Sequence, residues 1–236
     1  MSNKEVMQAF DKTAGLYDRT VHRYFSSRRA EVFAELGKGR ILEVGAGTGT
    51  VTEKLVKRGK VVASDISFNM LKNIGKRLKI PLAQFDAEHF PFKKGAFDTI
   101  VSGETIYYLD NPERFFKEAF YVLRKGGVCA VSSTNRLWDF LNTPRSWMIN
   151  LINSSSLLSK AAKAVNWDYG WADEKQFYGF YEKKIKQMFK QAGFSDIKTK
   201  PVVIFPFSKL DRFNRELEKT FLGKVSLGKV VWGRKG

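Results

Sequence analysis

The sequence predicts a doubly wound α/β fold, in which a mostly parallel, seven-stranded sheet carries helices on both faces and a helical lid is inserted over one edge. Two observations lead to this prediction. Short apolar runs rich in β-branched residues alternate five times with segments of helical periodicity, which is typical of a parallel sheet. The 236 residues also hold no internal repeat, so we expect a single domain over residues 1–236.

Five of the expected strands lie in the first part of the chain. Residues 4–36 show helical spacing with a break near Gly15, so that residues 1–36 are expected to form a helical cap. Strands are expected at 39–45, 60–65, 81–87, 96–103 and 128–134. The helices between them are expected at 50–59, ended by Gly59, at 67–78, with Ser67 as N-cap, and at 111–127, with Asn111 as N-cap and Gly126 after the end.

The remaining strands follow an interruption. Residues 136–176 break the alternation and contain four of the five tryptophans, which predicts a helical insertion over the carboxyl edge of the sheet and over the active site. A helix is expected at 177–192. Two final strands, antiparallel to each other, are expected at 195–207 and 228–235, with a helix at 210–222 between them.

Composition limits the classes of function. With Cys129 as the only cysteine and two histidines, we expect no internal disulfide, zinc cluster or histidine-rich metal site. No apolar run reaches about 18 residues, and the first residues lack the apolar centre of a secretion signal, which favours a cytoplasmic protein. The formal net charge of +17 leaves two interpretations open, a solvated basic surface or an anionic partner such as a membrane surface or nucleic acid.

Three glycines interrupt the junction between the first strand and its helix. The stretch RILEVGAGTGTVTEKL places Gly45, Gly47 and Gly49 at alternate positions, although glycine there costs up to about 1 kcal/mol relative to alanine. We therefore expect a ligand to approach this backbone. Glu43, in an otherwise apolar strand, favours a cationic ligand over a diphosphate. The spacing also departs from the Gly-x-Gly-x-x-Gly of dinucleotide sites.

Two more carboxylates follow the next strands along the chain. Asp65 ends the second strand, where a carboxylate can accept hydrogen bonds from both ribose hydroxyls. Asp86 follows the third strand, where it can accept from an exocyclic amine. The ligand that suits all three acidic residues is an adenosine that carries an amino acid and a sulfonium.

Four segments carry a family resemblance. ILEVGAGTG, VVASDIS, QFDAEHFPFKKGAFDTIVSGETIYYL and VLRKGGVCAVSS together resemble the class I S-adenosylmethionine-dependent methyltransferases, and within them the ubiquinone/menaquinone-biosynthesis (methyltransferase type 11) subgroup. The resemblance covers residues 5–135 well and the AGF-containing tail loosely, and LRKGG departs from the proline that the family usually has before the glycines. It implies a Rossmann-like methyltransferase fold, S-adenosyl-L-methionine as cofactor, and a cofactor site made by Tyr17, Glu43, Gly45, Ala46, Gly47, Gly49, Asp65, Ile66, Asp86, Ala87, Ser102 and Gly103. Tyr17, in GLYDR, is the expected lid residue.

The acceptor is less well defined by the sequence. Methyl transfer to a hydroxyl or a carbon needs a general base, for which Glu104, His89 and Tyr107 are the candidates. We expect a small-molecule or lipid-like acceptor, bound under the tryptophan-rich insertion by an enzyme that is cytoplasmic or peripheral at the membrane. An RNA methyltransferase acting on tRNA and a non-catalytic S-adenosylmethionine-binding protein are the alternative interpretations.

Overall fold

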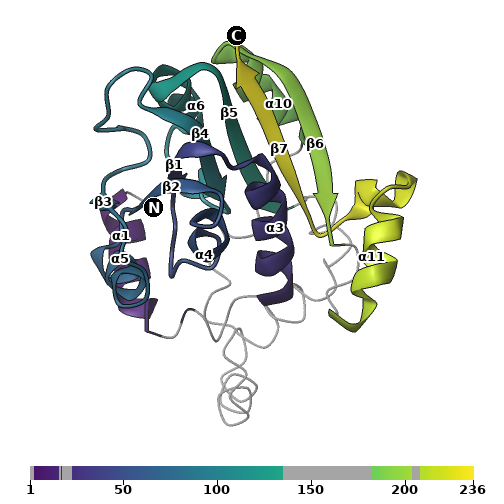
Figure 1. Ribbon diagram of the computed structural model, residues 1–236, viewed down its shortest axis with the longest axis horizontal. Coiled ribbons are helices and arrows are strands. Elements are labelled where there is room, and N and C mark those ends of the chain that lie inside the picture. The colour runs from purple at the N-terminus through teal and green to yellow at the C-terminus, as the bar shows by residue number, and fades with distance from the viewer. Residues whose placement is uncertain (1–2, 16, 18–22, 135–181, 204–207) are drawn as a thin grey trace, which may run out of the picture.

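The computed structural model is built around one seven-stranded sheet (Figure 1). It describes residues 3–15, 17, 23–134, 182–203 and 208–236. In the order β3-β2-β1-β4-β5-β7-β6, only β7 runs antiparallel to its neighbours among the described strands, which confirms the predicted fold class. The strands are β1 (Gly39–Val44), β2 (Gly59–Asp65), β3 (Leu82–Gln84), β4 (Phe97–Gly103), β5 (Leu123–Thr134), β6 (Phe194–Val202) and β7 (Gly228–Lys235).

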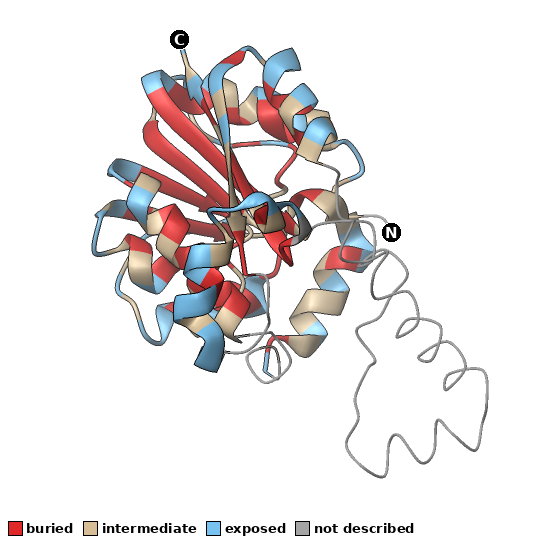
Figure 2. Ribbon diagram, turned by 90° about the vertical axis from the view of Figure 1, so that its right-hand side faces the viewer, coloured by how far each residue is buried: buried red, intermediate tan, exposed pale blue. Residues whose placement is uncertain are grey.

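Helices cover both faces of the sheet, and the strands between them are mostly buried (Figure 2). The α-helices are α1 (Asn3–Thr13), α3 (Arg23–Leu36), α4 (Thr52–Leu55), α5 (Phe68–Gly75), α6 (Pro112–Val122), α10 (Glu182–Gln191) and α11 (Asp211–Leu217). Short 3-10 helices are η1 (Ile106–Tyr108), η3 (Ser208–Leu210) and η4 (Phe221–Val225).

Successive side chains of β1 point to opposite faces of the sheet, so the core consists of two layers. Leu42 points to the face covered by α6 and α10, whereas Ile41 points to the face covered by α3 and α4. The first layer is rich in phenylalanine from α6 and α10, and the second is centred on Phe33 of α3. Burying a side chain of this size contributes about 1.5–3 kcal/mol, so these two layers stabilise the packing of the helices on the sheet.

The predicted helix caps are present, but two predicted helix ends are wrong. Ser67 accepts a hydrogen bond from the Met70 amide at 3.1 Å, and Asn111 accepts from the Arg114 amide at 3.2 Å. The helix predicted at 50–59 corresponds to α4, which spans only Thr52–Leu55, and Gly59 belongs to β2. A Cβ on Gly59 would lie 2.2 Å from the Gly39 carbonyl oxygen, so this glycine permits strand contact and does not end a helix.

The helix predicted at 111–127 ends at Val122. Leu123 is fully buried, has an extended backbone and pairs with Phe97 of β4, so tertiary packing draws it into β5. Gly126, with φ of +74°, lies in the irregular start of that strand and not at the helix end.

The described part of residues 1–36 contains α1 and α3, which lie at different positions. α1 lies against α5 beside β2 and β3, whereas α3 packs on the sheet and contributes Phe33 to the core (Figure 1). The predicted insertion at 136–176 lies outside the described residues.

Candidate functional site

A cleft opens at the carboxyl ends of β1, β2 and β4, and encloses about 650 Å³ of space including its mouth. Eight of the predicted cofactor residues line it: Tyr17, Gly45, Gly47, Asp65, Ile66, Asp86, Ala87 and Gly103. Residues that were not predicted as site residues complete its walls, chiefly Asn3, Val6 and Phe10 of α1, Phe85, and Tyr108 and Leu109 at η1. The cleft therefore combines acidic groups from strand ends with apolar walls.

The glycine turn forms the floor of the cleft. Gly45 has φ of +72°, and a Cβ there would lie 2.1 Å from Thr105 Oγ1, so this position requires glycine for packing. Gly47 has φ of +55°, and a Cβ there would meet only Tyr17, at 3.7 Å. Gly47 is thus the position at which the missing side chain leaves space for a ligand.

Asp65 joins the turn to the next helix. Its carboxylate accepts hydrogen bonds from the Gly47 amide at 2.8 Å and from the Ser67 amide at 2.9 Å. Burial raises the pKa of Asp65, against the lowering effect of these amides. Because each carboxylate oxygen can accept a second hydrogen bond, Asp65 can fix the turn and still receive a ligand hydroxyl.

Asp86 lies at the far end of the cleft, under α1. One of its oxygens accepts from the Glu88 amide at 2.9 Å, and the other accepts from the Asn3 side-chain amide at 2.6 Å. The residue therefore ties α1 to the segment after β3. It faces the cleft beside Ala87, where an exocyclic amine could also reach it.

Four predicted cofactor residues do not line the cleft. Ser102 donates to the Val44 carbonyl at 2.9 Å, and Ala46 and Gly49 are joined by a backbone hydrogen bond within the turn. Glu43 is 3% exposed and lies on the face that α3 covers. Its Oε2 atom has no hydrogen-bond partner among the described residues, and burial raises the pKa of Glu43 to about 8.

Glu104 is held in a strained conformation at the edge of the cleft. Its φ is +57°, a region that costs a non-glycine residue on the order of 1–3 kcal/mol. The carboxylate accepts from Ser132 Oγ at 2.8 Å, from the Tyr107 hydroxyl at 3.1 Å and from the Thr134 amide at 3.1 Å. Groups from η1 and β5 thus fix the carboxylate of a residue that lines the cleft.

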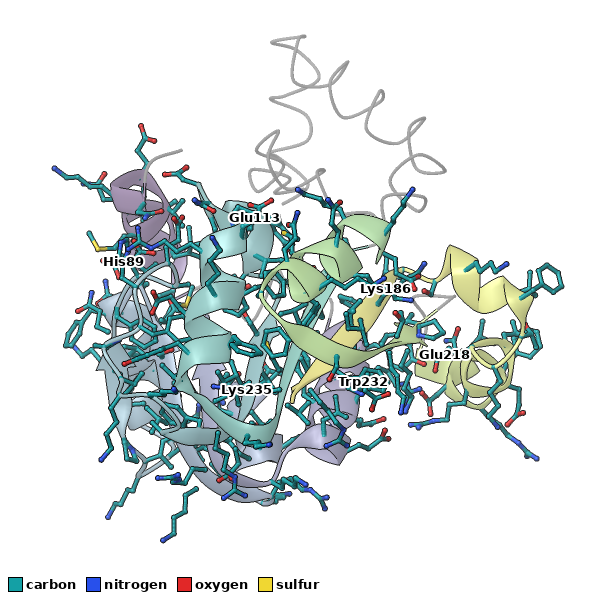
Figure 3. All side chains as sticks on the ribbon, turned by 90° about the horizontal axis from the view of Figure 1, so that it is seen from above. His89, Glu113, Lys186, Glu218, Trp232 and Lys235 are labelled. Carbon is teal, nitrogen blue, oxygen red and sulfur yellow. The ribbon has the colours of Figure 1, made fainter. Side chains whose placement is uncertain are left out.

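Tyr107 and His89 occupy different surroundings. Burial, together with the Glu104 charge, raises the pKa of Tyr107 well above its ordinary value, so the hydroxyl stays protonated and donates to Glu104. His89 is half exposed, with Nδ1 3.4 Å from Asp86, and lies beside α1 (Figure 3). The structure brings Tyr107 to Glu104 but does not bring His89 there.

The sequence did not predict the residues of other elements that contact Glu104. Arg29 of α3 lies with Nη1 3.4 Å from the Glu104 carboxylate, and Ser132 and Thr134 come from β5. No local pattern marks these residues. By contrast, Val6 and Phe10 stand four residues apart on α1, and this spacing could have indicated a helix face turned to the cleft.

A glycine turn followed by carboxylates at neighbouring strand ends of a doubly wound sheet defines a nucleoside-binding α/β protein. A model of the family described as "Methyltransferase domain" matches residues 42–131. The chain is 27% identical to the ubiquinone/menaquinone biosynthesis C-methyltransferase of Nitrosospira multiformis, over 82% of this chain and 85% of the relative.

Two further comparisons agree on the class. The malonyl-[acyl-carrier protein] O-methyltransferase of Geobacter sulfurreducens is 33% identical, over 55% of this chain and 53% of the relative. The crystal structure of an S-adenosylmethionine-dependent methyltransferase from Thermotoga maritima superposes with a TM-score of 0.66 at 22% identity, over 98% and 99% of the two chains, which shows the shared fold. Together these findings support a class I S-adenosylmethionine-dependent methyltransferase with S-adenosylmethionine as its cofactor.

No described helix is both long and apolar enough to span a membrane. In the same part of the chain, histidine, cysteine and acidic side chains do not gather in groups of three or more that could hold a metal ion.

Proposed function

We propose that the protein transfers a methyl group from S-adenosylmethionine to a small, lipid-like acceptor, and that Glu104 is the general base. The proposal is based on the presence of an apolar wall and a single carboxylate, that of Glu104, on the same part of the cleft. Phe10, Tyr108 and Leu109 form an apolar wall, and Glu104, whose side chain is 16% exposed, lines the same space. Such a site suits an apolar molecule with one reacting hydroxyl or acidic carbon. Relatives named as ubiquinone/menaquinone biosynthesis C-methyltransferases support this choice.

The cofactor residues are proposed from the sequence resemblance and from their fit to the ligand. Asp65 with Ile66 would receive the ribose, and Asp86 with Ala87 the adenine. The turn from Gly45 to Gly49, Ser102 and Gly103 would adjoin the methionyl part, with Glu43 beneath it and Tyr17 above. The bare Gly47 position and the open lone pairs of Asp65 support this fit.

The bound cofactor would supply an activated methyl group on its sulfonium. The protein's contribution is then to position the acceptor, exclude water and accept a proton. Glu104 would take the proton from the acceptor at its carboxylate, while Ser132, Tyr107 and Thr134 keep that carboxylate in place. We assign His89 no part in this proton transfer, because its contact is with Asp86 at the other end of the cleft.

Incubation with methyl-labelled cofactor and fractionated cell extract tests the proposal. We expect label in the organic-soluble fraction, and none with an Asp65→Ala variant, which should bind S-adenosylhomocysteine weakly in calorimetry. Label in ribonuclease-sensitive material would instead support RNA methylation. Incorporation into no fraction at all would support a non-catalytic binding protein.

We further propose that the enzyme meets an anionic membrane surface through the segment from η3 to η4. Phe213 is 53% exposed and Phe221 is 77% exposed, and exposed Lys209 and Arg212 lie in the same segment. Aromatic side chains among cations suit the boundary of an anionic bilayer. The segment stands beyond β6 at one end of the molecule (Figure 1).

A further inference from the structure

A second recess lies at the amino edge of the sheet and encloses about 830 Å³ of space including its mouth. Its lining comes from the starts of β1, β2 and β4 and from the residues that follow α4 and precede β3. The cleft lies at the carboxyl ends of the same parallel strands, so one strand length, about 20 Å, separates the two sites. The proposed methyl transfer makes no use of this recess.

Apolar side chains make up most of the recess. Val62 and Phe97 pack with the core layer under α6 and α10. Val56, Val61 and Ile80 pack with the layer under α3 and α4. The recess therefore opens where both layers reach the edge of the sheet, and three of these five side chains are only partly buried. A recess of this size and lining favours an apolar occupant.

Two cations, Arg40 and Lys60, stand among this apolar lining, and none of the described residues that line it is acidic. Lys60 is exposed, and its side chain has no partner among the described residues. Arg40 Nε lies 3.8 Å from the Asp98 carboxylate, but Asp98 is in closer contact with Arg124. Because one carboxylate serves two arginines, the positive charge at the recess is not balanced.

The two cations are also neighbours. Arg40 and Lys60 are register partners on β1 and β2, and adjacent strands lie about 4.8 Å apart. Exposed Lys38 and Arg58 lie two residues before them. Like charges so placed repel each other, and this repulsion opposes folding. A bound anion would turn the repulsion into attraction, which indicates a binding role for the pair.

We propose that this recess binds the anion of a medium- to long-chain fatty acid. The carboxylate would lie on Lys60 and Arg40, and the alkyl chain would enter the apolar recess. A nucleic acid would satisfy the cations but leave the apolar lining unused, and a neutral lipid would do the reverse. This is a second site, independent of the acceptor that the cleft takes.

Decanoate is the probe, and decyltrimethylammonium matches its chain length with the opposite charge. Calorimetry with saturating S-adenosylhomocysteine should show one decanoate site, at least about 10-fold tighter for decanoate than for the cation. From octanoate to dodecanoate, each added CH₂ should tighten binding about 2- to 4-fold. Amide chemical shifts should move at residues 59–62.

Charge reversal at one position provides the matched comparison. Lys60→Glu should weaken decanoate binding about 5- to 20-fold, since an attraction becomes a repulsion. Lys125→Glu, an exposed position at the same edge that does not line the recess, should keep the wild-type affinity. Both variants should keep the melting temperature and the affinity for S-adenosylhomocysteine.

Several results would overturn the proposal. These are equal decanoate affinity in Lys60→Glu and the wild type, affinity that does not depend on chain length, and shifts confined to residues of the cleft. An RNA oligonucleotide that binds where decanoate does not, with both reversals weakening it alike and a steep loss on added salt, would assign this edge to a polyanion instead. Decanoate binding by a protein that does not bind S-adenosylhomocysteine would count against the proposed function alone.

Discussion

Glu104 combines a strained backbone with a carboxylate that is fixed in place, and this combination indicates that its position serves a function. It adopts a left-handed backbone conformation, and its carboxylate is fixed by groups from η1 and β5. We predict that Glu104→Gln lowers the rate of methyl transfer by about 10²- to 10⁴-fold, because the amide keeps the shape but cannot accept the acceptor's proton. The affinity for S-adenosylhomocysteine should change little. Initial rates and calorimetry on the same preparation measure both quantities.

A control variant separates this effect from general damage. Glu113, which is not among the residues that line the cleft, pairs with Lys184 at 2.7 Å. Glu113→Gln should keep the wild-type rate. A Glu104→Gln variant with a rate near that of the wild type would contradict the role of a general base.

Glu43 gives the protein a predictable dependence on pH. Burial raises its pKa to about 8 in the folded protein, whereas in the unfolded chain it titrates near its ordinary value. Folding therefore binds a proton between these two pH values, and the contribution of Glu43 to the free energy of unfolding falls as the pH rises. The slope is at most about 1.4 kcal/mol per pH unit, and it ends above the folded pKa.

Urea denaturation of the wild type and of Glu43→Gln measures the contribution of Glu43 to the free energy of unfolding. The stability advantage of the wild type over the variant should shrink steadily between pH 5 and pH 8, a range set by the two pKa values. Below that range the two proteins should differ by a constant amount. Parallel stability profiles for both proteins would show that Glu43 is not buried as the structure places it.

At the scale of elements, one carboxylate of α1 makes two of the hydrogen bonds that hold α1 against α5. Asp11 Oδ1 accepts from Ser67 Oγ at 2.5 Å and from the Asn69 amide at 3.1 Å, so a residue of α1 caps the start of α5. We predict that Asp11→Ala costs about 0.5–2 kcal/mol of stability and weakens S-adenosylhomocysteine binding, because α1 carries Val6 and Phe10 into the cleft.

Hydrogen exchange locates the effect. Amides of α1 should exchange faster in Asp11→Ala than in the wild type, and the ligand should slow them in both proteins. Asp11→Asn, which keeps one acceptor oxygen, should fall between them. If exchange accelerates only in α5, α1 is not held by this contact.

The elements also show what a sequence can and cannot predict. The strands and their mostly parallel arrangement follow from the alternation of apolar runs with helical segments. Asp65 and Gly47 were predictable because a strand end and a turn follow from the local sequence. Gly59 and Leu123 were misassigned because partners distant in the sequence, Gly39 and Phe97, decide their conformations. The Glu104 cluster joins α3, η1 and β5, so only folding reveals it.

For the whole molecule, the net charge of +17 favours association with anionic surfaces. The proposed membrane segment lies at α11, and Glu218 of this region and His89 appear at opposite ends of the molecule in Figure 3. On α11, Arg215 is paired with Asp211 and Glu31, so the charges added by the segment are modest. Binding should therefore depend on Phe213 and Phe221 as well as on charge.

We predict that the protein sediments with vesicles that contain phosphatidylserine at low ionic strength, and much less with vesicles of phosphatidylcholine alone. Added salt should weaken binding, because screening reduces the attraction between cations and the anionic surface.

Replacing Phe213 and Phe221 by serine should reduce the bound fraction and leave the melting temperature nearly unchanged, since both side chains are mostly exposed. Phe68, 59% exposed at the start of α5, provides the matched control, and Phe68→Ser should bind like the wild type. Equal loss in both variants, or none in either, would mean that α11 and η4 do not form the membrane contact.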